Sequence, residues 1–338
     1  MINRRDFLQR SVLSTAALAS PFATIPGFAA GDATAENLVK TFYDTLTEPQ
    51  RAALVFGFDD PLRSKISNNW HITEQRIGSF LTPDQNAMVR EIFLSLHSEA
   101  YRDKVIGQVE HDSGQKGFGD CSIAIFGEPG SGKSEFVLTG RHCTRRVDGD
   151  AVAGKAFGGP IFYGHAAEGF NESAEHKGNA YWYQAQSANR VFEMLDGKQR
   201  EAALLEKEAA DDASTIQLKR QAGDLPGLAT ADMTADQKTA VRGVLNDLLM
   251  PFREEDRVES MKLVEIVLTA VIVLPMVEKA GFDDLHLSFY KEGDLGKDGI
   301  WDNWRLEGPH MVWYFRGAPH VHTWVHISDP ETPREPRA

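Results

Sequence analysis

The chain has 338 residues, with 49 acidic and 36 basic side chains, and a formal net charge of −13. Residues 1–30 contain three arginines and one aspartate, which sum to +2, so residues 31–338 carry −15. This length supports one large domain or two moderate ones. So acidic a surface argues against nucleic acid and anionic membranes as partners.

The N-terminus is typical of a twin-arginine (Tat) export signal. Arg4 and Arg5 are followed by Phe7 and Leu8 and then by a modest apolar stretch. We therefore expect residues 1–30 to be a signal peptide, recognised by the Tat export machinery. The expected location is the periplasm or the cell exterior. The Tat route carries proteins that have already folded, often around a cofactor.

Four segments predict helix starts by the same local pattern. In each, threonine or aspartate stands three residues before glutamine, which is the signature of a capping box. The four pairs are Thr47 and Gln50, Thr82 and Gln85, Asp196 and Gln199, and Thr234 and Gln237.

The segment Gly127–Ser134 fits the phosphate-binding pattern G-x-x-x-x-G-K-[ST] at every position. A true P-loop needs a helix that starts inside this pattern. The residues that follow instead place Phe136, Leu138, Gly140 and His142 on one face with a period of two, which predicts a strand. We therefore expect a turn between two strands, and a nucleotide-binding protein is the disfavoured alternative. ATP is also scarce at the expected location.

Four further segments are less informative. The glycine- and aromatic-rich residues 156–166 predict a tight, partly buried loop, and residues 201–220 predict a solvated helix without chemistry of its own. The apolar residues 266–274 are too few to span a bilayer and predict a buried helix. The charged, proline-containing residues 330–338 predict a disordered tail.

The predicted helices and strands suggest an internal duplication. The capping boxes come in two pairs, and each pair precedes a strand-rich stretch, at residues 121–147 and 285–327. We expect a single α+β domain over residues 36–329, with copies at about 36–165 and 190–328. Each copy would hold capped helices followed by a β-hairpin, with the hairpins packed together in one globule. Chance similarity of common cap and turn chemistry is the alternative.

Residues 320–327 carry the clearest candidate site. Their strict alternation predicts a strand with His320, His322, Trp324 and His326 on one face. Alternate residues lie about 6.5–7 Å apart along a strand, so two imidazoles can converge on one metal ion at about 2.0–2.1 Å each. The alternative is a half-exposed strand whose histidines bond to backbone carbonyls.

A metal held by His320 and His322 needs at least one more ligand from elsewhere. The candidates are His142, His165 and Glu128, because each lies in a glycine-rich turn or on the predicted hairpin. Five other histidines are expected to be surface or packing residues: His71, His97, His111, His176 and His286. Adjacent carboxylates, such as Asp211 and Asp212, are expected to be solvated in so acidic a chain.

Several of these residues occur together in a known family. The segments are Phe56–Pro61 with Trp70 and His71, Phe126–Pro129, Gly140–His142, Gly308 with Pro309, and Pro319–Trp324. In this order they resemble the domain of unknown function 3500 family of exported bacterial proteins, over about residues 39–328. The family's turn after F-G-E-P is not a phosphate-binding loop, which implies that Lys133 and Ser134 are incidental. The resemblance implies no particular reaction.

The leading hypothesis is an exported protein with a histidine-rich metal site, acting as a metal-dependent hydrolase or oxidoreductase on an unidentified small molecule. Glu128 would be the proton acceptor. Imidazole ligands suit Zn, Cu, Fe and Ni. The main alternative is a non-catalytic periplasmic binding or structural module.

Overall fold

The computed structural model describes residues 34–149, 151–166, 179–218, 225–265, 281–296 and 298–329. Four predictions lie outside these ranges: the signal peptide, the buried helix at 266–274, the tail at 330–338 and the role of His176. Among the described helices, none has both the length and the apolar character that crossing a bilayer requires.

The chain is a mixture of helices and strands, as the α+β prediction requires. The helices are α1 (Ala35–Thr45), α2 (Glu48–Leu54), α3 (Ile77–Phe80), α4 (Pro83–Ser95), α5 (Arg102–Asp112), α6 (Tyr183–Glu193), α7 (Gly197–Ala203), α8 (Ala235–Leu249) and α9 (Glu254–Val264). The strands are β1 (Val55–Phe56), β2 (Ser122–Glu128), β3 (Lys133–Gly140), β4 (Cys143–Val147), β5 (Ile161–His165), β6 (Leu204–Leu205), β7 (Leu228–Ala229), β8 (His286–Tyr290), β9 (Asn303–Glu307), β10 (Met311–Arg316) and β11 (Val321–Ile327).

Within the described residues, the strands form one sheet of eleven strands. Its order is β1-β2-β3-β4-β5-β11-β10-β9-β8-β6, and β7 pairs with β8 outside this path. The short strands β1 and β6 are parallel to their neighbours, and the other pairs are antiparallel. Strands β5 and β11 therefore join the two halves of the sheet at its centre. Each half has five strands along this path and is larger than the predicted hairpin.

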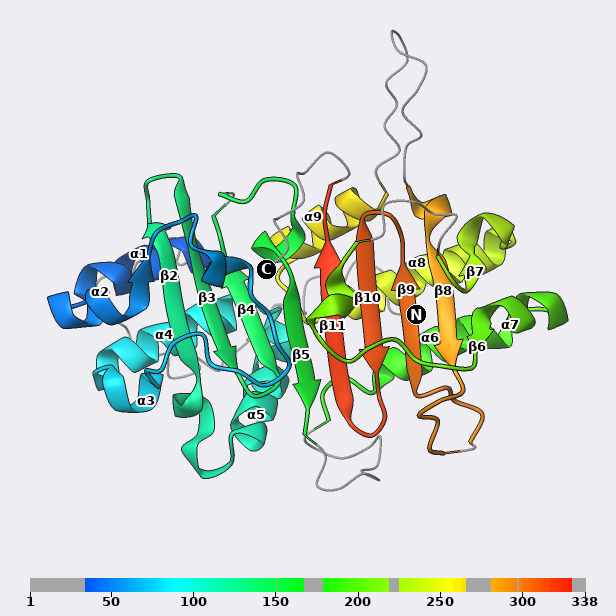
Figure 1. Ribbon diagram of the computed structural model, residues 1–338, viewed down its shortest axis with the longest axis horizontal. Coiled ribbons are helices and arrows are strands. Elements are labelled where there is room, and N and C mark those ends of the chain that lie inside the picture. The colour runs from blue at the N-terminus through cyan, green and yellow to red at the C-terminus, as the bar shows by residue number, and fades with distance from the viewer. Residues whose placement is uncertain are drawn as a thin grey trace, which may run out of the picture. The chain divides into compact units, whose positions relative to one another are not determined.

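The two faces of the sheet are covered differently (Figure 1). Helices cover one face, whereas two irregular segments, residues 57–76 and 206–218, cross the other. Trp70 of the first segment donates to Thr144 Oγ1 at 3.0 Å, and Tyr314 donates to the Ala209 carbonyl of the second at 3.3 Å. Both faces of the central strands are consequently buried.

All four capping boxes are present, as predicted. In each, the glutamine side chain accepts from the backbone N–H of the N-cap residue at 2.8–3.1 Å. The glutamines also bond to one another in two reciprocal amide pairs, Gln50 with Gln85 and Gln199 with Gln237. The pairs lock α2 to α4 and α7 to α8, so the cap residues also carry tertiary contacts.

The phosphate-binding pattern forms the turn between β2 and β3, as predicted. Glu128 pairs with Lys133 across the hairpin, and the chain continues as strand β3 instead of the helix that a P-loop needs. The Lys133 ammonium lies 3.2 Å from the exposed Asp59 carboxylate. A cavity of about 220 Å³ beside the turn is lined by the acidic residues Glu36 and Asp148 as well as Lys40. Acidic groups there would repel a phosphate.

Two local predictions were wrong. The segment 156–166, predicted as a loop, contains the central strand β5. The prediction failed because a strand buried on both faces lacks the polar–apolar alternation that reveals a half-exposed strand. The segment 201–220, predicted as a solvated helix, leaves the helical conformation after Ala203. It then crosses the sheet as the covering segment 206–218, with only a short 3₁₀ turn at Ala213–Ile216.

Candidate metal centre

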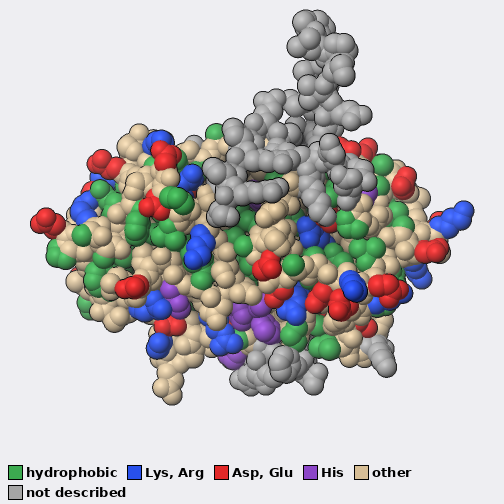
Figure 2. Space-filling model, in the orientation of Figure 1, with side chains coloured by type: hydrophobic (Ala, Val, Ile, Leu, Met, Phe, Trp, Pro, Cys, Tyr) green, Lys and Arg blue, Asp and Glu red, His purple; other side chains and the backbone are tan. Residues whose placement is uncertain are grey.

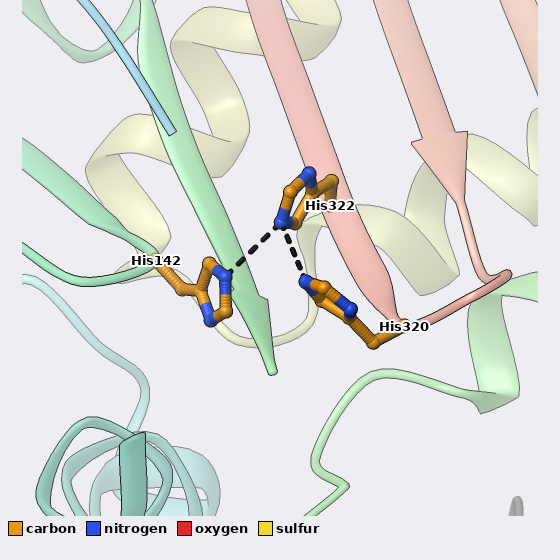
Figure 3. A group of neighbouring side chains, drawn as sticks. All are labelled: His142, His320 and His322. Carbon is orange, nitrogen blue, oxygen red and sulfur yellow. Dashed lines mark hydrogen bonds between the residues drawn. The ribbon is translucent and has the colours of Figure 1, made fainter. Parts of the chain in front are cut away.

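Three histidines from two distant parts of the chain meet at one end of the central strands (Figure 3). His142 lies in the tight turn between β3 and β4, His320 directly precedes β11, and His322 is the second residue of β11. Strand β5 runs between β4 and β11, and its Gly164 pairs with His322. A Cβ atom on Gly164 would lie 3.4 Å from the Cβ of His142 and 2.1 Å from the Val321 carbonyl oxygen. Glycine is therefore needed where the strands approach.

We call His142, His320 and His322 the histidine triad. Their Nε2 atoms point toward one another (Figure 3). The Nε2 atom of His322 lies 3.0 Å from that of His142 and 2.9 Å from that of His320. His142 and His322 are buried, and His320 is partly exposed. Figure 2 shows a group of histidine side chains that reaches the molecular surface.

The backbone of His142 is held in a left-handed conformation, with φ at +53°. This conformation is uncommon for residues other than glycine and concentrates at functional sites. The backbone N–H of His142 donates to the Asn68 carbonyl at 3.0 Å, which helps to hold the turn in place.

Two carboxylates hold the outer nitrogens of the triad. The Nδ1 atom of His142 lies 2.8 Å from Asp112 Oδ2, and the Nδ1 atom of His322 lies 2.7 Å from Asp211 Oδ2. Asp112 is the last residue of α5 on the helical side, whereas Asp211 belongs to the covering segment 206–218 on the opposite face. Asp211 also accepts from Trp324 Nε1 at 2.9 Å.

Both carboxyl groups are held in the ionised form. Burial alone would raise the pKa of Asp112, but the hydrogen bond from His142 and the nearby His165 ring bring that pKa below its usual value. Burial opposes ionisation of Asp211 in the same way, but the hydrogen bond from His322, followed by the hydrogen bond from Trp324 and the charge of Arg316, lowers its pKa. Ionised carboxylates can only accept hydrogen bonds.

The two carboxylates therefore fix the proton positions in the triad. His142 and His322 must each donate from Nδ1, so a neutral ring leaves a lone pair on Nε2. Burial lowers the pKa of His142 despite the opposing effect of Asp112. Burial, followed by the neighbouring His322 and His142, lowers the pKa of His320 to about 3. When His142 and His322 are both neutral, their two Nε2 lone pairs face each other across 3.0 Å.

A bound cation would relieve this repulsion. Imidazole nitrogens bind Zn²⁺ at about 2.0–2.1 Å, and tetrahedral ligands at that bond length lie about 3.3 Å apart. The observed Nε2 separations of 2.9 and 3.0 Å are close to this value. Carboxylates that hold the outer nitrogens of histidine ligands are a regular feature of metal sites. The triad could therefore hold a transition-metal ion, with further coordination positions left for water or substrate.

His165 is near the triad but belongs to a neighbouring group. It ends β5, and its Nδ1 atom lies 3.6 Å from Asp112 Oδ1, on the other side of the carboxylate that holds His142. Together with His111 and Asp112 it forms a second set of side chains whose ligand atoms lie within 4.8 Å of one another. His111, expected to be a surface or packing residue, is thus part of a candidate site.

The structure does not bring Glu128 to the histidines. Glu128 ends β2 at the turn that precedes Lys133, whereas His142 follows the far end of β3, beyond Gly140. Its side chain is exposed, and the length of strand β3 separates it from the triad. This separation gives Glu128 no route to a proton at the triad.

A family model matches most of this chain. The family described as protein of unknown function (DUF3500) matches residues 30–275. The chain belongs to this family. No curated protein and no solved structure matches the chain. In this DUF3500 protein the matched residues include His142, Asp112 and Asp211, while His320 and His322 lie beyond them.

Sequence reasoning missed the two carboxylates of this DUF3500 protein. Asp211 was expected to be solvated, together with Asp212. One feature of the sequence could have pointed to Asp112. It is the last residue of α5, where a carboxylate interacts unfavourably with the helix dipole. Such a position suggests a tertiary partner, but the identity of the partner cannot be read from local sequence.

Proposed function

We propose that this protein binds a transition-metal ion through His142, His320 and His322, and that this site is its functional centre. The observation that carries the proposal is the meeting of three Nε2 atoms, two of them on rings whose Nδ1 protons are committed to Asp112 and Asp211. Histidines that merely fill space have no need of such convergence.

The chemistry of such a centre depends on its metal. Three neutral nitrogen ligands suit Zn, Cu or Fe, and a metal with an open position supplies either an activated water or a site for redox chemistry. We therefore propose a metal-dependent hydrolase or oxidoreductase. His320 is the partly exposed member of the triad, so substrate would approach from its side.

The metal content of purified variants tests this proposal. The full chain and its His320→Ala/His322→Ala variant are stripped with a chelator, reloaded with Zn²⁺, dialysed, and measured by elemental analysis. We expect the variant to hold about one equivalent less than the unaltered chain, because it keeps only one of three triad ligands. Thermal unfolding of the metal-free forms shows whether both are folded.

A matched variant and a milder one sharpen the result. His286→Gln alters a partly buried histidine outside both histidine groups and should leave the metal content unchanged. His320→Ala alone should weaken binding without disturbing the buried core. Equal metal content in the unaltered chain and the double variant would show that the histidines are only packed, as in a non-catalytic module. The metal retained by protein purified without reloading separates hydrolytic zinc from redox-active copper or iron.

We also propose that the domain arose by internal duplication. Apart from the short elements α3 and β7, two successive runs follow the same order: α1, α2, β1, α4, α5 and β2–β5, then α6, α7, β6, α8, α9 and β8–β11. The reciprocal glutamine pairs recur in both runs, and the sheet order is symmetric about the β5–β11 pair. An experimental structure in which a single rotation fails to superpose the two runs would contradict this origin.

A further inference from the structure

We propose a second transition-metal site beside the histidine triad, formed by His111, Asp112 and His165. This second ion would be bound in addition to the one proposed for the triad, and its binding does not require the triad to be occupied. The three ligand atoms lie within 4.8 Å of one another, as do those of the triad.

The site is assembled from one helix end and one strand end. His111 and Asp112 are the last two residues of α5, and His165 is the last residue of β5. The rings of His111 and His165 lie 5.3 Å apart at an interplanar angle of 30°. That ring separation resembles the 4.8 and 5.1 Å between His142 and the other two triad rings. Both groups thus hold imidazoles at the spacing that allows convergence on one ion.

Burial and charge favour a cation at this point. Asp112 and His165 are 4 % and 1 % exposed, while His111 is partly exposed and leaves a route from solvent. Within the described residues, the basic side chains within ion-pair distance of Asp112 are His142 and His165, and no lysine or arginine is among them. A buried carboxylate is costly unless it is paired with a positive charge or coordinates a metal ion. A divalent cation bound by the three side chains would provide that charge.

Asp112 would link the two metal sites through its two oxygens. Oδ2 lies 2.8 Å from His142 Nδ1 and accepts from Gln108 Nε2, whereas Oδ1 faces His165 and accepts from the Ala166 backbone N–H at 2.9 Å. A cation on the Oδ1 side would leave the hydrogen bond to His142 in place. Both sites can therefore be filled in one molecule.

The number of metal ions per chain tests this inference. The chelator-stripped full chain is titrated with Co²⁺, whose visible absorption reports nitrogen coordination, and bound metal is measured after gel filtration. We expect two equivalents in the unaltered chain, one in His111→Gln, and one in His320→Ala/His322→Ala. His286→Gln should retain two. His111→Ala provides a second variant of the same ligand, and thermal unfolding of the metal-free forms must match that of the unaltered chain.

The variants separate this inference from the proposed function. The same number of equivalents in His111→Gln, His111→Ala and the unaltered chain would overturn the second site. A decrease in the His111 variants without one in His320→Ala/His322→Ala would support the second site and contradict the triad. Losses of one equivalent in each set of variants support both sites.

Discussion

At the scale of single residues, two carboxylates determine what the histidines can do. Asp112 and Asp211 accept the Nδ1 protons of His142 and His322. In a neutral ring this leaves the Nε2 lone pair directed into the triad. A carboxylate partner also makes a coordinating imidazole a stronger ligand. The carboxylates therefore bear on metal affinity although neither is a member of the triad.

Replacing Asp211 should weaken metal binding without removing a ligand. In Asp211→Asn the amide oxygen can still accept the Nδ1 proton of His322, but the negative charge and the hydrogen bond from Trp324 are lost. We expect the affinity of the triad for Zn²⁺ to fall about 10- to 100-fold, measured by competition with a chelator of known affinity. Asp212→Asn is the control, because the exposed Asp212 only caps the turn at Ser214. Equal losses in the two variants would argue against a specific role for Asp211.

At the scale of elements, the site depends on how closely β5 and β11 pack. Gly164 of β5 lies where the Val321 carbonyl and the His142 side chain both approach, and a Cβ atom there would overlap the carbonyl oxygen. The glycine is thus required by contact between strands and not by its own turn conformation. The pairing of β5 with β11 brings the His142 turn beside the His320–His322 segment.

A methyl group at Gly164 should lower the stability of the fold. We expect Gly164→Ala to lower the free energy of unfolding by about 3 kcal/mol, because the strands must separate to admit the Cβ atom. Gly107→Ala is the matched control, since nothing lies within 4 Å of a Cβ atom at this position in α5. That control should raise the free energy of unfolding by up to about 1 kcal/mol. Urea unfolding in the presence of a chelator measures the free energy of unfolding of both variants. An unchanged free energy of unfolding in Gly164→Ala would show that the strands do not require glycine at this position.

At the scale of the whole molecule, the proposed metal centre depends on the assembled sheet. Its ligands come from turns and strands far apart in the chain, with His142 and His322 separated by 180 positions. The centre can form only after the sheet is complete. A protein exported in the folded state could acquire its metal inside the cell, before it meets competing metals outside.

The twin arginines should be required for export. In Arg4→Lys/Arg5→Lys, we expect the precursor to accumulate in the cytoplasm, because lysine lacks the planar fork of the guanidinium group. Arg10→Lys, outside the pair, should be exported normally. Cell fractionation and the mass of the mature N-terminus measure the outcome. Export of the double variant at the normal level would contradict Tat targeting.

The sequence by itself determined the features that depend on neighbours in the chain. The capping boxes predicted helix starts, because they join residues only three positions apart. Alternation placed His322, Trp324 and His326 on one face of β11, where all three bond to the covering segment 206–218. The turn at Gly127–Ser134 was predictable for the same reason.

Only the tertiary structure decided which histidines meet and which carboxylates hold them. Asp112 ends a helix, Asp211 lies in a segment predicted as a solvated helix, and His165 ends a strand predicted as a loop. Strand β5 gave no alternating pattern because both of its faces are buried. Its pairing with β11 brings these residues together, and contacts between distant segments leave no trace in local composition or spacing.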